Sequence, residues 1–328
     1  MLFDRFTETI FLKEGSDLQD KLKALTKLKE KYPDNKDLQE EWYIVKKGLD
    51  GENEIRYELS KANLGLYVLH DVNFQYGDLK AQVDYIVITK YCCYFIECKN
   101  LMGNITVDEK GNFIREYTYN GEKIKKGIYS PLRQVEAQRD VYKKIWNISL
   151  SKNSVINSFK RALAEKNFTD IHKVLFVLAN KDTILNIKKA PGYVYDRVIK
   201  ADQLIKRIQN DIEFSDKKYW DNQKGMYEWA MGFMKRHKYT DIDYEKYYTK
   251  KFIDKDNDDS LGERLIEFRK TRAEEKNIPE FYVFNNEELE ALIKLKPETI
   301  EELEEANVLN EIRFKMHGES IIDVINKE

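Results

Sequence analysis

Two carboxylates and a lysine in an otherwise apolar stretch are the residues of this chain best suited to chemistry. Residues 84–99 read DYIVITKYCCYFIECK, so Asp84 begins the stretch while Glu97 and Lys99 end it. Ile, Val, Tyr and Phe on both sides of a short turn favour an antiparallel hairpin that is buried on both faces. Burying charged side chains there is unfavourable unless they pair or bind a metal ion. The stretch therefore predicts a site that does chemistry.

The register expected for this hairpin brings the acids onto one face. A two-residue loop sets Gln82 opposite Glu97 and makes Asp84 the diagonal neighbour of Glu97. Glu97 and Lys99 share that face because side chains alternate along a strand. Side chains in such positions start within roughly 7 Å of one another. Two carboxylates at this spacing suit one hard cation, with the lysine ammonium beside it.

The order of these residues is Asp, twelve residues, then Glu-x-Lys, and it resembles the PD-(D/E)xK nuclease superfamily. The resemblance implies that Asp84, Glu97 and the main-chain carbonyl of Cys98 bind Mg²⁺ or Mn²⁺. It implies that Lys99 orients or activates the water that attacks the phosphodiester. It also implies an α/β restriction-endonuclease-like core, in which helices flank a mixed central sheet.

The flanking residues narrow the resemblance to the nuclease-related domain, the NERD family, over roughly residues 51–180. Glu52 matches the family's Gly-Glu pair at the start of a helix, and Gln134 matches its Pro-x-x-Gln, although Ser130 stands where the family usually has Asn. By this resemblance Glu52 is a further metal-binding or orienting residue. Gln82 and Gln134 would support the metal ligands by hydrogen bonds or contact the substrate backbone.

A purely structural interpretation stays open for these residues. An Asp followed by Glu-x-Lys occurs by chance, and a solvated Glu–Lys pair needs no metal. Glu52 also fits an exposed acid in the first turn of a helix, where the macrodipole favours it, and Gln134 also fits a surface glutamine. His70 fits a packing residue better than a ligand. The alternative function is a non-catalytic adaptor that keeps the fold and binds nucleic acid or protein without turnover.

The chain divides into four expected segments. These are a helical hairpin over 1–50, the nuclease-like domain over 51–212, a helix with a charged linker over 213–258, and a helical domain over 259–328. Apolar stripes at helical spacing predict the first hairpin, which breaks near Pro33. A second strand pair between residues 104 and 119 is expected to extend the central sheet.

The last segment contains Ile-Pro-x-Phe-x-Val-Phe over 278–284 and Pro-x-Thr over 297–299. This order is similar to the HRDC domain found in RecQ-type helicases and RNase D. The resemblance implies a small all-α bundle that contacts nucleic acid or a protein partner such as a helicase. The chain itself has no G-x-x-x-x-G-K-[ST] loop for a helicase motor.

Charge is unevenly distributed along the chain. Residues 259–328 hold 10 basic and 18 acidic residues, a net charge of −8, whereas residues 151–250 hold 20 basic and 13 acidic residues, a net charge of +7. Phosphate contacts need cations, so the acidic bundle favours protein docking. In the basic segment the expected contacts with nucleic acid are Lys188, Lys189, Lys217 and Lys218. A solvated lysine-rich surface is the alternative.

Length and composition agree with an intracellular multi-domain enzyme, and the expected location is the cytoplasm. Of 328 residues 35% are charged, and no apolar run reaches the roughly 18 residues of a membrane span. Cys92, Cys93 and Cys98 are an odd number without metal-ligand spacing, which favours reduced core thiols. The combined expectation is a metal-dependent nuclease that hydrolyses DNA in processing, repair or defence against foreign DNA. RNA as substrate, the mode of cutting and the preferred strand structure stay open.

Overall fold

The computed structural model describes residues 6–119, 121–151, 167–215, 222–253, 259–276 and 278–326. The chain forms two compact units. One comprises Met1–Lys27 and Gln39–Ile242, and the other comprises Leu28–Leu38 and Asp243–Glu328.

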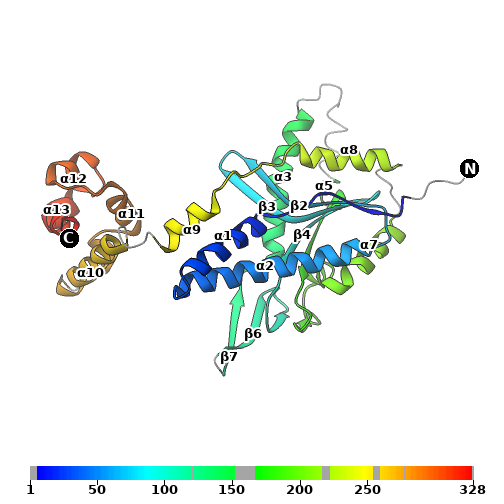
Figure 1. The fold of residues 1–328 in the computed structure, drawn as a ribbon, viewed down its shortest axis with the longest axis horizontal. Helices are drawn as coiled ribbons and strands as arrows, with labels where there is room; N and C mark the ends of the chain where they lie inside the picture. The colour runs from blue at the N-terminus through cyan, green and yellow to red at the C-terminus, as the bar shows by residue number, and fades with distance from the viewer. Residues whose placement is uncertain are drawn as a thin grey trace, which may run out of the picture. The chain divides into compact units, whose positions relative to one another are not determined.

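A six-stranded mixed sheet lies at the centre of the first unit (Figure 1). Its strands, in spatial order, are β1 (Thr9–Lys13), β2 (Leu66–Tyr76), β3 (Leu79–Ile88), β4 (Cys93–Lys99), β8 (His172–Leu178) and β10 (Val198–Lys200). The neighbours β2, β3 and β4 pair antiparallel, whereas β1 joins β2, β8 joins β4 and β10 joins β8 in parallel. This arrangement confirms the predicted mixed sheet.

Helices cover both faces of the central sheet. They are α2 (Lys36–Ser60) and α7 (Leu204–Glu213) on one face, and α3 (Pro131–Ser151) and α8 (Gln223–Met234) on the other. Alternation along the strands separates the two cores: Ile86 and Phe95 pack toward α3 and α8, while Tyr85 and Ile96 pack toward α2 and α7. Both faces of the hairpin are thus buried, as its apolar sequence predicted.

The N-terminal helices differ from the expected separate hairpin. The first is α1 (Asp17–Lys31), and Trp42 of α2 donates to the Thr26 hydroxyl at 2.9 Å. However, α2 runs through the predicted boundary at residue 50 without a break, so Gly51 does not open a helix. A Cβ at Gly51 would lie 2.8 Å from Asn100 Cβ, so this glycine serves close packing of α2 against the end of β4.

The second strand pair does not extend the central sheet. It belongs to a separate four-stranded sheet in the order β7 (Glu122–Ile128), β6 (Phe113–Tyr119), β5 (Asn104–Val107) and β9 (Leu185–Asn186). Gly103 precedes this sheet with φ at 89°, and a Cβ there would meet the carbonyl oxygen of Glu116 at 2.3 Å. The chain leaves the central sheet at a conformation that favours glycine.

The other elements of the first unit are short. They are α5 (Phe168–Ile171), α6 (Gly192–Tyr195) and the 3-10 helix η1 (Ala201–Gln203).

The second unit is helical, as predicted for the end of the chain. It contains α9 (Tyr244–Phe252), α10 (Asp259–Lys276), the 3-10 helix η3 (Glu280–Tyr282), α11 (Asn286–Leu295), α12 (Ile300–Ala306) and α13 (Glu311–Ile325). Asn285, Thr299 and Asn310 each cap the following helix through a side-chain oxygen. None of the helices that the structure describes is long and apolar enough to cross a membrane.

Candidate active site

The turn between β3 and β4 decides how the two acids face each other. Ile88 pairs with Cys93, so the loop has four residues and not the expected two. The Thr89 hydroxyl closes this longer loop, since it donates to the Cys92 carbonyl at 2.9 Å and accepts the Tyr91 amide at 3.1 Å. The predicted register is therefore wrong by two residues, a shift that leaves every side chain on its predicted face.

Asp84 and Glu97 become direct neighbours in this register. Tyr85 pairs with Ile96, and one further step along the hairpin sets Asp84 opposite Glu97. The expected register instead put Gln82 opposite Glu97. Opposite side chains start roughly 5 Å apart, closer than diagonal ones. The observed pairing therefore brings the two acids nearer to each other than expected.

The main chain of β4 holds the Asp84 carboxylate. The Cys98 amide donates to Asp84 Oδ2 at 2.7 Å. Burial raises the pKa of Asp84 well above its usual range, and the negative charges of Glu97 and Glu52 raise it further. The Cys98 amide and the Lys99 ammonium oppose this shift without cancelling it. The shift thus comes first from burial, and the two neighbouring acids add more to it than the Lys99 ammonium removes.

Glu97 is held by side chains from two elements. It is only 1% exposed, and its Oε1 accepts the Gln134 amide at 2.7 Å and lies 2.6 Å from Lys99 Nζ. Its Oε2 accepts the Gln138 amide at 2.9 Å. Gln134 is therefore a partner of Glu97 and not a free surface glutamine. These contacts fix one orientation of the carboxylate.

Lys99 is an ammonium at neutral pH. Burial alone would lower its pKa, but the charge of Glu97 and the hydrogen bond to it outweigh burial, so the pKa is raised. A lysine with a raised pKa is a poor base for taking a proton from water. Its chemistry is to hold an oxygen by a hydrogen bond and to stabilise negative charge.

Glu52 reaches the same region from the middle of α2. It is 5% exposed, and its Oε2 lies 2.8 Å from His70 Nε2. The His70 ring stacks on Tyr85 with centroids 4.4 Å apart, and the Tyr85 hydroxyl donates to the Glu52 carbonyl at 2.9 Å. Glu52 is thus a buried, oriented acid and not the exposed first-turn residue that the alternative supposed.

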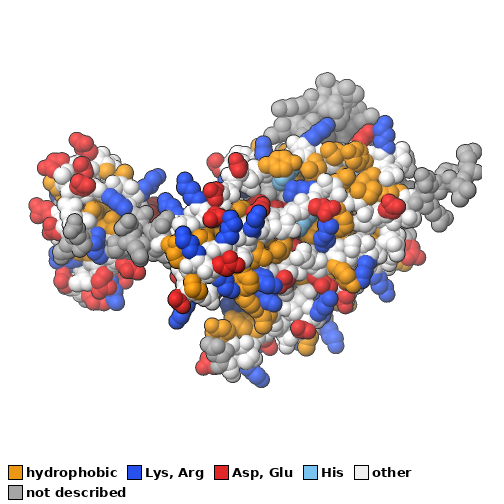
Figure 2. All heavy atoms as spheres, in the orientation of Figure 1, with side chains coloured by type: hydrophobic (Ala, Val, Ile, Leu, Met, Phe, Trp, Pro, Cys, Tyr) orange, Lys and Arg blue, Asp and Glu red, His pale blue; other side chains and the backbone are white. Residues whose placement is uncertain are grey.

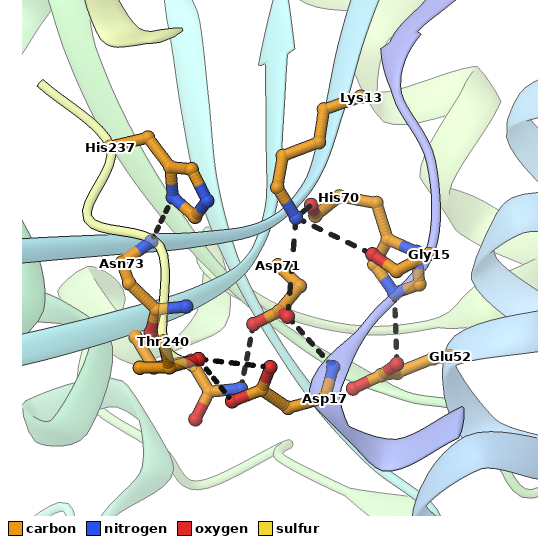
Figure 3. A network of polar contacts seen from close by, with 10 residues as sticks. Lys13, Gly15, Asp17, Glu52, His70, Asp71, Asn73, His237 and Thr240 are labelled. Atoms are coloured by element: carbon orange, nitrogen blue, oxygen red, sulfur yellow. Dashed lines mark hydrogen bonds and ion pairs between the residues drawn. The ribbon is translucent and has the colours of Figure 1, made fainter. Parts of the chain in front are cut away.

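Gln82 contacts Asp71, and Figure 3 shows the network of Asp71, Asp17 and Lys13 beside Glu52 and His70. The Gln82 amide donates to Asp71 Oδ1 at 2.7 Å, and Asp71 Oδ2 accepts the amide of Asp17 at the start of α1. Asp71 has φ at 56°, a conformation uncommon within a strand. Lys13 donates to the His70 carbonyl at 2.8 Å. Gln82 therefore supports the β2–β3 pair rather than the two hairpin acids.

One cleft of about 900 Å³ contains all the residues predicted for the catalytic site. Its lining includes Glu52, Gln82, Asp84, Glu97, Cys98, Lys99 and Gln134, together with Gln138. The sequence argument missed Gln138. It lies one turn after Gln134, and this spacing puts both amides on one face of α3, which was the available signal.

The comparisons with known proteins identify both parts of the chain. Residues 47–177 match the family model of the nuclease-related domain, NERD, and residues 258–325 match that of the HRDC domain. The chain carries a nuclease-related domain and an HRDC domain. Both resemblances seen in the sequence are thereby confirmed, and all the cleft acids fall within the nuclease-related domain.

A solved structure described as "D. radiodurans RecQ HRDC domain 3" is 40% identical to this chain. The match covers 21% of this chain and 92% of that chain, with a TM-score of 0.21. The comparison with curated proteins found no match.

The donor atoms of the nuclease-related domain fit a hard divalent cation. Asp84 Oδ1 has no hydrogen-bond partner among the described residues, and Glu97 Oε2 accepts a single bond. The β3–β4 pairing ends at Tyr85 and Ile96, and the Cys98 carbonyl lies on the same side of β4 as its amide, toward Asp84. Carboxylates, a carbonyl and water are the ligands that Mg²⁺ and Mn²⁺ prefer.

The carboxylate set is small. In the described part of the chain, no group of three or more His, Cys, Asp or Glu side chains is arranged to hold a metal ion. A cation here would therefore take two carboxylates and a carbonyl and keep several waters, as Mg²⁺ commonly does.

Lys188 and Lys189, two of the four lysines predicted to contact nucleic acid, are not part of the lining of this cleft. Lys188 lines a second cleft of about 710 Å³ with Lys200, Lys206 and Arg207. Lys189 lies 3.6 Å from the exposed Glu109. Lys217 and Lys218 lie outside the described residues.

The cysteines are buried and unpaired, as expected. Burial raises the pKa of the thiols of Cys92, Cys93 and Cys98. They are core residues, and Cys98 also lines the cleft.

Proposed function

We propose that the nuclease-related domain hydrolyses phosphodiester bonds of DNA with Mg²⁺ or Mn²⁺. The observation that carries the proposal is the pair of opposed acids, Asp84 and Glu97, in one cleft with an ammonium 2.6 Å from Glu97. Asp84, Glu97 and the Cys98 carbonyl would hold the cation. When bound, such a cation polarises a phosphoryl oxygen and lowers the pKa of a bound water.

Other side chains of the cleft would stabilise charge and orient the metal ligands. Lys99 places a positive charge where the phosphate becomes more negative during attack. Gln134 and Gln138 hold Glu97 in one orientation, so that its position does not depend on the substrate. Glu52, held by His70, adds a third negative charge to the cleft and favours cation binding there.

The HRDC domain is the proposed contact for a protein partner. Its segment carries 10 basic and 18 acidic residues, which disfavours a general grip on phosphates. A helicase is the partner class we propose, since the chain has no motor loop of its own. We place the reaction in the cytoplasm, in DNA processing, repair or defence against foreign DNA.

One observation favours a non-catalytic adaptor as the second candidate. Lys99, Gln134 and Gln138 already satisfy Glu97 on both oxygens without any cation. In that case the domain would bind nucleic acid or protein through the same cleft and turn nothing over.

Incubation of the purified protein with single-stranded, duplex and circular DNA, and with RNA, separates the two candidates. We expect DNA cleavage with Mg²⁺ or Mn²⁺, none with chelator, and none in Asp84→Asn. Asp140→Asn, which changes an exposed acid on α3, should cut like the unaltered protein. If the protein binds nucleic acid but cleaves none of these substrates with either Mg²⁺ or Mn²⁺, the adaptor function is supported instead.

A further inference from the structure

The rim of the active-site cleft is apolar and exposed. Tyr43, Ile44, Leu79, Met102 and Tyr129 line the cleft, with 48%, 57%, 48%, 51% and 73% of their surfaces exposed. Single exposed apolar residues are common on proteins, but a group around one cleft marks an interaction site. This rim is continuous with the acids at the floor.

The rim comes from segments on several sides of the acids. Tyr43 lies on α2, the helix that carries Glu52, and its hydroxyl is 3.7 Å from Met102 Sδ beyond the end of β4. Leu79 begins β3, and Tyr129 lies just before α3. A ligand in contact with the floor would therefore meet an apolar or aromatic side chain in more than one direction.

Basic side chains line the same cleft as these apolar residues. Lys47, Lys80 and Arg115 line the same cleft, and none of them forms an ion pair with a carboxylate among the residues that the structure describes. Lys47 Nζ lies 5.6 Å from the ring centroid of Tyr43. Figure 2 shows hydrophobic and basic side chains next to one another between α2 and the β6–β7 hairpin. The rim is thus suited to a ligand with both flat apolar faces and negative charges.

We propose that the cleft takes single-stranded DNA, whose unpaired bases stack on Tyr43 and Tyr129 while its phosphates meet Lys47, Lys80 and Arg115. This inference rests on the proposed nuclease function and names its substrate class. A duplex stacks the faces of its bases on one another, so along its length the two tyrosines would meet sugar, phosphate and base edges but no base face. An unpaired strand offers a flat face at every base and a negative charge at every phosphate.

The catalytic floor points to the same substrate. Glu97 is 1% exposed, so a phosphate must enter the cleft to reach it. A single strand can bend at its backbone and bring one phosphate inward while neighbouring bases stay on the rim. The stiff outer surface of a duplex lacks this freedom.

Binding of labelled oligonucleotides in chelator, followed by fluorescence anisotropy, tests the proposal with the intact chain. The probes have one length and are single-stranded DNA, blunt duplex DNA and single-stranded DNA without bases. We expect the ordinary single strand to bind most tightly. Tyr43→Ala and Tyr129→Ala should each weaken its binding about 5-fold to 100-fold, the usual range for one stacked base.

Matched variants and probes isolate stacking from charge and folding. The strand without bases should bind the tyrosine variants and the unaltered protein equally. Tyr129→Phe keeps a ring and should bind normally. Tyr119→Ala removes a 63%-exposed tyrosine of β6 that is not part of the cleft lining and should change nothing.

Two outcomes would overturn the inference. One is equal binding of all three probes by the unaltered protein, and the other is undiminished single-strand binding in both tyrosine variants. The rim would then be a docking surface for a protein. Cleavage with Mg²⁺ or Mn²⁺ is scored separately: tyrosine-dependent binding without cleavage removes the nuclease function alone, whereas cleavage that ignores both tyrosines removes this inference alone.

Discussion

Each unit of the molecule contains a buried glutamate next to a cation, but only one of the two pairs is suited to chemistry. Glu288 accepts two bonds from Arg313, at 2.6 and 2.8 Å, and also accepts the Asn285 amide at 2.6 Å as part of a helix cap. Both oxygens of this glutamate thus contact the same guanidinium, whose positive charge matches the single negative charge of the carboxylate. This pair is explained by the packing of α11 against α13.

The pair in the cleft lacks this balance. Glu97 lies 2.6 Å from Lys99, yet Asp84 faces Glu97 and draws on the same ammonium. Burial is the main cause of the raised pKa of Asp84, and the negative charges of Glu97 and Glu52 raise it further. A buried ion pair is therefore weak evidence of function by itself, whereas a surplus of acid that opens into a cleft is strong evidence.

The largest expected effect is the loss of DNA cleavage when an acid of the cleft is neutralised, compared with neutralising Glu288. Asp84→Asn and Glu97→Gln should each reduce DNA cleavage by orders of magnitude, because each removes a charged ligand of the proposed cation. Calorimetric titration with Mn²⁺ should show correspondingly weaker binding. Glu288→Gln, the matched change in the other unit, should leave both unchanged. Normal Mn²⁺ binding in the two cleft variants would refute the metal assignment.

The second prediction compares the two basic side chains that contact these glutamates, Lys99 and Arg313. Lys99→Met keeps the apolar stem but loses the ammonium, and it should lower turnover about 100-fold to 1000-fold, as expected when one donor to a developing charge is lost. Binding of DNA should change little, because the interaction acts mainly in the transition state. The Arg313→Met variant should cleave DNA at the rate of the unaltered protein. The measurements are the cleavage rate of each variant at saturating DNA and its DNA affinity in chelator. Near-normal turnover in Lys99→Met would contradict the role given to the ammonium.

The third prediction concerns the partner of Glu52. His70→Ala leaves Glu52 without its orienting bond, so we expect affinity for Mn²⁺ to fall about 10-fold to 100-fold. His317→Ala changes a buried histidine of the second unit and should not alter Mn²⁺ affinity. Equal affinities in the two variants would mean that Glu52 takes no part in metal binding.

The fourth prediction uses the pH dependence of stability. A carboxyl whose pKa is raised by folding makes the folded state more stable below the pKa of the unfolded chain, and this stability is lost as pH rises toward the folded pKa. In chelator, Asp84→Asn should therefore be more stable than the unaltered protein at neutral pH. The gap should close on acidification by up to about 1.4 kcal/mol per pH unit. Denaturant unfolding at several pH values measures it, and a gap that widens in acid would contradict the burial of a charged Asp84.

The smallest expected effect is that of removing the HRDC domain. Deleting residues 259–328 should leave the rate on short DNA within about two-fold, because that segment has a net charge of −8 and contributes few cations for phosphate. The measurement is cleavage of short single strands by the intact and truncated proteins. A large loss of binding on truncation would show that the HRDC domain is the main DNA contact.

Much of the site was predictable because it depends on local spacing. Alternation along a strand put Glu97 and Lys99 on one face whatever the loop, and the even shift in register kept Asp84 on that face too. The HRDC domain could likewise be predicted from the positions of its apolar residues and prolines. These features depend on neighbours in the sequence, so one chain is enough to see them.

Other parts depended on side chains that meet across the fold. The Thr89 hydroxyl sets the loop length and so the true pairing of Asp84 with Glu97, a choice that strand patterns do not contain. The predicted helix start at Gly51 is wrong for a related reason, since Gly51 lies within α2 and allows its close packing against Asn100. Both errors concern contacts that the local sequence leaves free.

By itself the sequence determined which residue types could act and which faces of their strands and helix they share. Tertiary structure alone decided how those residues are held: Glu52 by His70, Gln82 by Asp71, and the second oxygen of Glu97 by Gln138. It also decided which exposed aromatic residues surround the cleft. The physical reason is that periodicity constrains direction along one element, whereas a hydrogen bond between distant residues exists only once the packing of several elements has set their separation.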